Sequence, residues 1–195
     1  MPTAFLSKSE PSEAPLSSAF VERVKRLDKS SLEQYEERAA DDAAERYYSD
    51  EFAWSAFYWA RALHLAELRD APTVTRATFE SNFAASLHHL GSYGEAIDVY
   101  EKALEAFRAC LATPLLSRWV AGVDKGLVEK RMLFLEHRLR MARRGERPQR
   151  GEFLDENCQL RYDGKEHFLK KRDEAQTSNH LARQPGELEP LVSTW

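Results

Sequence analysis

Apolar residues recur at three- and four-residue steps in the middle of the chain, a spacing that predicts amphipathic helices. Between residues 93 and 107 they fall on one helical face, while acidic residues and a lysine occupy most of the other. Small alanines within this row let a neighbouring helix approach closely. We expect a helix from Tyr93 to about Ala112, preceded by a tight turn at Gly91. The apolar row consists of Tyr93, Ala96, Ile97, Tyr100, Ala103, Leu104 and Phe107.

The pattern continues on both sides of this helix. Helices are predicted over residues 18–27, 32–48, 52–69 and 78–90, with Ser30 or Ser31 as the N-cap of the second and a loop over residues 70–76. Pro114 opens a further helical stretch that ends near Arg144. Long strand-like alternations are absent, so the predicted class is all-α.

The segment from Thr78 to Leu111 resembles a tetratricopeptide repeat (TPR), a helix–turn–helix unit of 34 residues. It departs from the family at Glu80, where Trp is usual, and at Arg108, where the closing Pro is usual. The resemblance implies a short α-solenoid. The residues that carry it are Phe83, Ala84 and Leu87 in the first helix, Gly91 and Tyr93 at the turn, and Ala96, Tyr100, Ala103 and Leu104 in the second helix.

A second, divergent copy of this unit is predicted over residues 32–68. Its second helix matches the clear repeat at a constant offset of 41 residues: Phe52, Ser55, Ala56, Trp59, Ala62 and Leu63 correspond to Tyr93, Ala96, Ile97, Tyr100, Ala103 and Leu104. The offset exceeds the family period by seven residues, which we assign to the loop over residues 70–76. After the clear repeat we expect a capping helix, because the end of a helical stack needs a polar outer face.

Composition fits one helical domain with extended ends. The chain has 195 residues, 31% charged and 43% apolar. We divide it into an N-terminal arm (1–17), a helical domain (18–144) and a C-terminal arm (145–195) with a short helix at 165–175. No secretory signal or membrane span is apparent in the sequence. A cytoplasmic location is expected, with a cytoskeletal or ciliary assembly and an organelle interior left open.

The sequence shows little sign of catalytic or metal chemistry. It contains no Gly-rich phosphate loop, no HExxH and no paired CxxC. His88 and His89 are adjacent, so they point in different directions and lack the i, i+4 spacing of a ligand pair. Cys158 and His167 lie in a sparse segment without a predicted pocket. The expectation is therefore a protein that is not an enzyme, with no catalytic or metal-binding residues and no cofactor.

Charge is unevenly distributed along the chain. Residues 33–51 contain eight acidic and two basic residues, whereas residues 129–150 contain eight basic and three acidic residues. Arg140, Arg143 and Arg144 in the basic segment are candidates for contacts with an acidic partner or with RNA phosphates. Aromatic residues do not alternate with these arginines, so no base-stacking platform is predicted.

We interpret the chain as a protein-interaction scaffold or adaptor subunit that packs within a larger assembly. An RNA-associated subunit using residues 138–150 is the alternative. The resemblance implies a concave face lined by first helices, where Asn82, Ser86 and His89 would contact a partner. Trp54 and Tyr58, in an aromatic helix whose main alternative role is core packing, and Phe153, Phe168 and Trp195 in the C-terminal arm complete the candidates.

Overall fold

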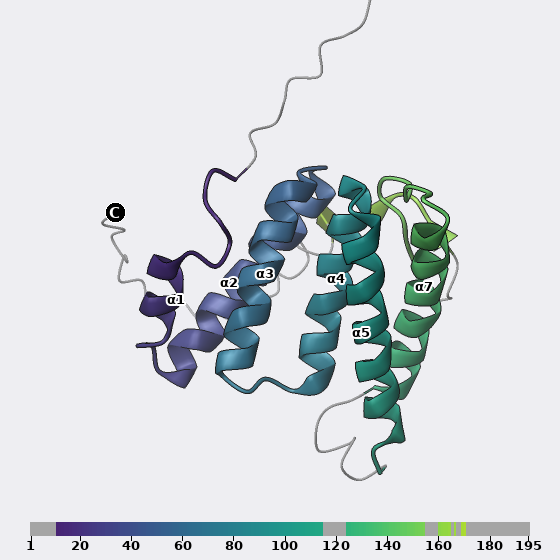
Figure 1. Ribbon diagram of the computed structural model, residues 1–195. Helices are drawn as coiled ribbons and strands as arrows, with labels where there is room; N and C mark the ends of the chain where they lie inside the picture. The colour runs from purple at the N-terminus through teal and green to yellow at the C-terminus, as the bar shows by residue number, and fades with distance from the viewer. Residues whose placement is uncertain (1–10, 115–123, 155–159, 165, 167–168, 171–195) are drawn as a thin grey trace, which may run out of the picture.

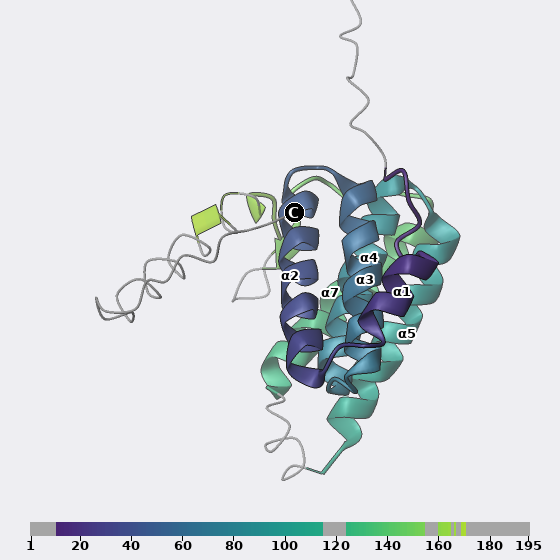
Figure 2. The ribbon, with the colours of Figure 1, turned by 90° about the vertical axis from the view of Figure 1, so that its left-hand side faces the viewer.

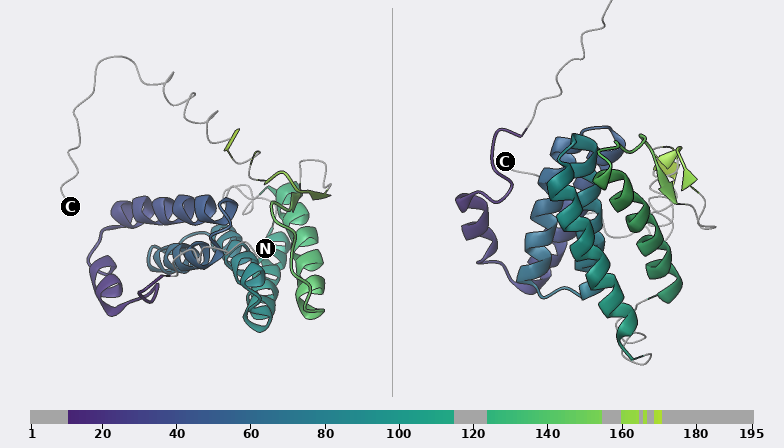
Figure 3. Two further views of the ribbon diagram at one scale, coloured as in Figure 1. Left: turned by 90° about the horizontal axis from the view of Figure 1, so that it is seen from above. Right: turned by 45° about the vertical axis from the view of Figure 1, so that its right-hand side comes forward.

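The computed structural model describes residues 11–114, 124–154, 160–164, 166 and 169–170, and this part of the chain is all-α. Its six helices pack in sequential order, with α1, α2 and α3 at one end of the row and α7 at the other (Figure 1, Figure 3). Two short strands, β1 (Phe153–Leu154) and β2 (Leu160–Arg161), pair antiparallel after α7. The helices are α1 (Ser18–Val24), α2 (Lys29–Tyr48), α3 (Phe52–Leu68), α4 (Thr73–Leu90), α5 (Tyr93–Ala112) and α7 (Lys125–Arg143).

Two helix starts differ from the sequence prediction. Helix α2 begins at Lys29 because the side chain of Asp28 accepts a hydrogen bond from the Ser31 amide at 2.7 Å, so neither Ser30 nor Ser31 is the N-cap. Helix α4 begins at Thr73, so the predicted loop over residues 70–76 is wrong. The chain reverses between α3 and α4 in a tight turn with Asp70 at φ 57°, and the reversal is complete by residue 72. The residues by which the 41-residue offset exceeds the family period therefore lengthen α4.

The turn between α4 and α5 is formed at Gly91, as predicted. Gly91 adopts φ 86°, a left-handed conformation that glycine reaches without steric penalty. The Ser92 amide donates to the Leu87 carbonyl at 3.0 Å, and the Gly91 amide donates to the His88 carbonyl at 3.1 Å. These two bonds form a Schellman motif that satisfies the end of α4.

The predicted apolar row of α5 forms the centre of the main core. Ala96, Tyr100, Ala103 and Phe107 are fully buried, and Leu104 is nearly so. Tyr93 and Ile97 pack against this cluster from its edge. Equivalent positions of α3 and α5 are buried alike: Ser55 with Ala96, Trp59 with Tyr100, and Ala62 with Ala103. The two helices therefore bury positions that correspond at the offset of 41 residues.

The aromatic face of α3 is covered by the chain's own N-terminal part. Helix α1 lies across α3 (Figure 2), and its Phe20 packs in the cluster that contains Trp59. The guanidinium of Arg61 lies over two rings, 4.5 Å from the centroid of Phe20 and 4.2 Å from that of Phe57. The Nε of Arg61 also donates to the Pro15 carbonyl at 2.9 Å. The described end of the predicted N-terminal arm, residues 11–17, therefore contacts α3 through Pro15.

The described residues after α7 also pack on the helices. Pro148 and Glu152 are buried, and Arg150 forms an ion pair of 3.2 Å with Asp50 at the turn between α2 and α3. The Gly164 amide donates to the Gly151 carbonyl at 2.9 Å. Residues 147–151, which belong to the predicted C-terminal arm, are therefore held against the ends of the helices.

Replacing Gly91 by alanine should destabilise the fold by about 1–2 kcal/mol, because an L side chain is strained at this φ. A Cβ there would also lie 3.2 Å from Arg147 Nη2. Gly94 supplies the matched control, since it lies in α5 and its Cβ would meet nothing within 4 Å. Gly94→Ala should stabilise the fold by roughly 0.5–1 kcal/mol. Urea unfolding midpoints test the pair, and equal effects of the two changes would contradict this account of the turn.

Candidate partner-binding site

A fully buried arginine lies at one end of the helical row. Arg138 of α7 has no exposed surface, and its Nε lies 3.1 Å from Oε1 of Glu152, which is also buried. The pair is close enough for an ionic interaction but lacks hydrogen-bond geometry, and Nη1 has no hydrogen-bond partner within the described residues. Burial disfavours the charge on Arg138, but the nearby Tyr47, Tyr100 and Glu152 favour it and leave its pKa raised.

His88 of α4 connects the network to α5 and to the segment after α7. Its Nε2 lies 2.8 Å from the Glu146 carbonyl, and its Nδ1 lies 3.4 Å from the Tyr100 hydroxyl. A neutral ring with the proton on Nε2 satisfies both contacts, since a carbonyl oxygen only accepts. Burial lowers the pKa of His88 to about 4, and the charge of Arg138 adds to the effect.

His89 connects α4 to α2 and α3. Its ring stacks on Phe52 with centroids 4.1 Å apart, and its Nε2 lies 3.0 Å from the Tyr47 hydroxyl. Burial, followed by the charge of Arg138, lowers the pKa of His89 to about 3. The network thus joins α2, α4, α5, α7 and residues 146–152 through groups that face inward. It fixes the helices and offers no described route for a substrate.

Two of the three residues expected on a concave face lie in the interior. Ser86 is fully buried, and its hydroxyl lies 2.9 Å from that of Ser55. His89 is 8% exposed, and its ring contacts Phe52 and Tyr47. Both positions face neighbouring helices because α4 is enclosed on several sides, so neither side chain offers a surface to a partner. The expectation of an exposed position is wrong for these two residues.

Asn82 of α4 and Arg131 of α7 are polar residues on the sides of these helices that carry the buried network. Both are half-buried, and neither side chain forms a hydrogen bond or an ion pair within the part of the chain that is described. Asn82 precedes His89 by seven residues, and Arg131 precedes Arg138 by seven, so each lies about 10.5 Å along its helix from the buried network, on the same side. Helices α4 and α7 run in the same direction (Figure 1), which brings the two residues to one level.

The structure distinguishes Arg131 from the other arginines of α7. Burial lowers the pKa of its guanidinium, and no carboxylate of the described residues offsets this effect. A desolvated cation without a partner attracts an anion more strongly than a hydrated surface cation does. Sequence reasoning missed Arg131 and treated Arg138 only as part of the basic segment, although their seven-residue spacing beside the apolar row of α7 was a usable signal.

The aromatic candidates Trp54 and Tyr58 are only half-exposed. Their rings stack at 6.1 Å, and Phe57 meets each of them edge-on. This cluster adjoins Arg61 and the covering N-terminal residues. The packing accounts for most of the aromatic content of α3 and leaves little of it as an open contact surface.

Most arginines of the basic segment already have acidic partners. Arg143 pairs with Glu101 at 2.6 Å, and Arg144 lies 3.8 Å from Glu146. Arg140 is exposed and has no ion pair among the described residues. With Arg138 and Arg150 also paired, the segment offers fewer free guanidinium groups than its sequence indicates. This arrangement adds no support to RNA binding.

The remaining candidates lie at the margin of what is described. Phe153 begins β1, and only its backbone is described. Four of the residues named from the sequence lie outside the described part: Cys158, His167, Phe168 and Trp195. The same holds for residues 115–123 of the predicted helical stretch after Pro114, the first ten residues of the predicted N-terminal arm and most of the predicted helix at 165–175. Within the described ranges, no three His, Cys, Asp or Glu residues are grouped to hold a metal. None of the helices described is long and apolar enough to span a membrane.

Arg138→Met should destabilise the fold by about 3–5 kcal/mol, because it leaves the Glu152 carboxylate buried without its cation. The double change Arg138→Met with Glu152→Met should recover much of this loss, since both buried charges are then removed. Urea denaturation of both single variants and the double variant measures the coupling. Additive losses would show that the pair does not interact in the way the geometry indicates.

Stability should fall as the pH is lowered from 6.5 towards 4. The folded pKa of His88 is about 4, against 6.5 for the free group, so the unfolded chain takes up a proton in this range while the folded chain does not. The part of this loss that comes from His88 is at most about 3 kcal/mol, and His89, whose folded pKa is about 3, adds to it. His88→Gln keeps an amide donor but does not titrate, so its stability should change less with pH. An unchanged pH slope of the unfolding free energy in this variant would refute the assignment.

Scans of this chain against protein-family models, curated proteins and solved structures find no match. The site therefore has to be interpreted from its own residues.

Proposed function

We propose that this protein is a non-catalytic scaffold or adaptor that binds a segment of another protein on the face formed by α2, α4 and α7. The observation that carries the proposal is the pair Asn82 and Arg131, two half-buried polar side chains left without partners among the described residues at one level of this face. Buried polar groups are normally hydrogen-bonded, so groups of this kind are suited to a bound ligand.

The helical arrangement supports a divergent TPR-like architecture as part of this proposal. Helices α2–α3 and α4–α5 would be two repeats, because α3 and α5 bury equivalent positions 41 residues apart. Helix α7 would be the cap. The side of α7 opposite its buried residues is exposed and mostly charged, as expected at the end of a helical stack. It carries Glu129, Leu133, Arg140 and Arg144.

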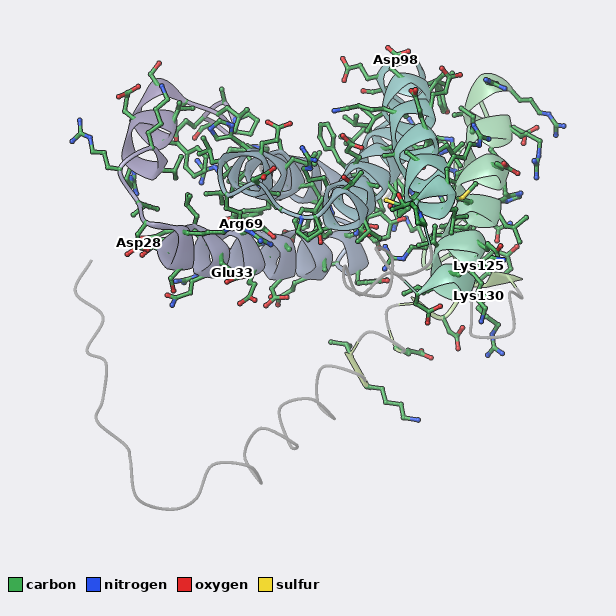
Figure 4. All side chains as sticks on the ribbon, turned by 90° about the horizontal axis from the view of Figure 1, so that it is seen from below. Asp28, Glu33, Arg69, Asp98, Lys125 and Lys130 are labelled. Carbon is green, nitrogen blue, oxygen red and sulfur yellow. The ribbon has the colours of Figure 1, made fainter. Side chains whose placement is uncertain are left out.

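The two sides of the proposed face differ in charge. Glu33, Glu37 and Asp41 are exposed along α2 at four-residue intervals, whereas Lys130 and Arg131 lie on α7. Figure 4 shows Glu33 and Lys130 towards opposite ends of the row of helices. An extended segment could meet the amide of Asn82 with its backbone and place a carboxylate at Arg131. We therefore propose an acidic protein segment as the partner, oriented with its negative charge towards α7.

Purification of the full chain from its source should bring stable protein partners with it. The double variant Asn82→Ala with Arg131→Ala should lose them, with an affinity reduction of about a hundredfold if each contact contributes about tenfold. Arg26→Ala is the matched control, because Arg26 is an exposed arginine outside α2, α4 and α7 and has no ion pair in the described residues. Equal retention of the partners by the double variant would rule out this face.

A further inference from the structure

A groove lies between α5 and α7, with a volume of ≈ 740 Å³. Leu104 and Leu139 form its floor, and both are almost fully buried. Its walls are charged, with acidic and basic residues on both helices. These are Glu101, Glu105 and Arg108 from α5, and Glu136, Arg140 and Arg143 from α7.

Two ion pairs cross the groove and define the register of its two helices. Arg108 lies 3.3 Å from Glu136, and Arg143 lies 2.6 Å from Glu101. The two pairs are separated by seven residues on both helices, which shows that α5 and α7 are antiparallel with a constant register. The pairs therefore bridge the helices at both ends of the groove.

The same register places Glu105 and Arg140 at one level between these two pairs. Glu105 precedes Arg108 by three residues, and Arg140 follows Glu136 by four. Both residues are exposed, and neither forms an ion pair or a hydrogen bond within the described residues, so they do not pair with each other. The groove thus carries one available carboxylate and one available guanidinium on its two rims.

An acidic group on one rim and a basic group on the other make the groove complementary to the groove of a second copy that is turned by 180°. In a two-fold arrangement, Arg140 of one copy meets Glu105 of a second copy, and the reciprocal contact forms at the same time. We propose that a second copy of this chain docks on the α5–α7 groove and forms an isologous dimer through this reciprocal charge pair. Because the two contacts are near solvent, the dimer should be weak and sensitive to salt.

The dimer would use a different surface from the α2–α4–α7 face. Glu105 and Arg140 point away from the interior, whereas Asn82 and Arg131 lie on the sides of α4 and α7 that carry the buried network. A result against self-association would therefore leave the proposed partner-binding face unaffected, and a result against that face would leave the dimer unaffected.

Sedimentation velocity of the full chain over a concentration series at low ionic strength tests for the dimer. The dimer fraction should rise with concentration and fall when salt is added. Arg140→Glu and Glu105→Arg should each weaken self-association by at least about tenfold, because each variant presents like charges to its own copy. Arg38→Glu on α2 makes the same change of charge away from the groove and should leave the dimer unchanged.

Mixing the two variants gives the decisive result. The rims of Arg140→Glu carry two carboxylates and those of Glu105→Arg two guanidiniums, so the variants should form a heterodimer although neither forms a homodimer. Unchanged urea unfolding midpoints would show that both variants are folded. The proposal is overturned if the unmodified chain stays monomeric at every concentration, or if the mixture shows no heterodimer.

Discussion

The buried charge of Arg138 is the constraint on which the arrangement of this protein depends. An ionised guanidinium removed from water is costly by several kcal/mol unless an opposite charge accompanies it. Glu152 supplies that charge from a segment that follows α7, so the chain after the helix has to return to the stack. The same return brings the Glu146 carbonyl to His88 and buries Pro148. The need to pair the buried charge of Arg138 thereby helps to position α7 against α4 and α5.

The electrostatic consequence extends to the histidines. Burial opposes the protonation of His88 and His89, and the positive charge of Arg138 nearby adds to this effect. Both rings therefore act as neutral hydrogen-bonding and stacking groups. The polar interior fixes the relative positions of α2, α4 and α7, and Asn82 and Arg131 occupy the same sides of their helices two turns away. The candidate site thus lies two turns from a network of contacts that joins α2, α4, α5 and α7.

Periodicity was sufficient to predict the helices but not their surroundings. The apolar row of α5 and the turn at Gly91 follow from local spacing and from backbone sterics, and both are confirmed. The start of α4 was missed because the turn at Asp70 takes fewer residues than its polar composition suggested. The burial of Ser86 and His89 depends on which helices enclose α4, and this is decided by tertiary packing. Local patterns likewise cannot show that Arg61 binds residues before α1.

The contact between Arg61 and the N-terminal residues makes the chain its own ligand at α3. Phe20 and the Pro15 carbonyl are joined covalently to the surface they cover, so their effective concentration there is high, on the order of millimolar for a short flexible connection. An external protein could occupy the aromatic face of α3 only by displacing them. An external protein therefore needs enough affinity to displace Phe20 and the Pro15 carbonyl from α3. Proteins that bind weakly are excluded from this side of the molecule, while the opposite side stays open to them.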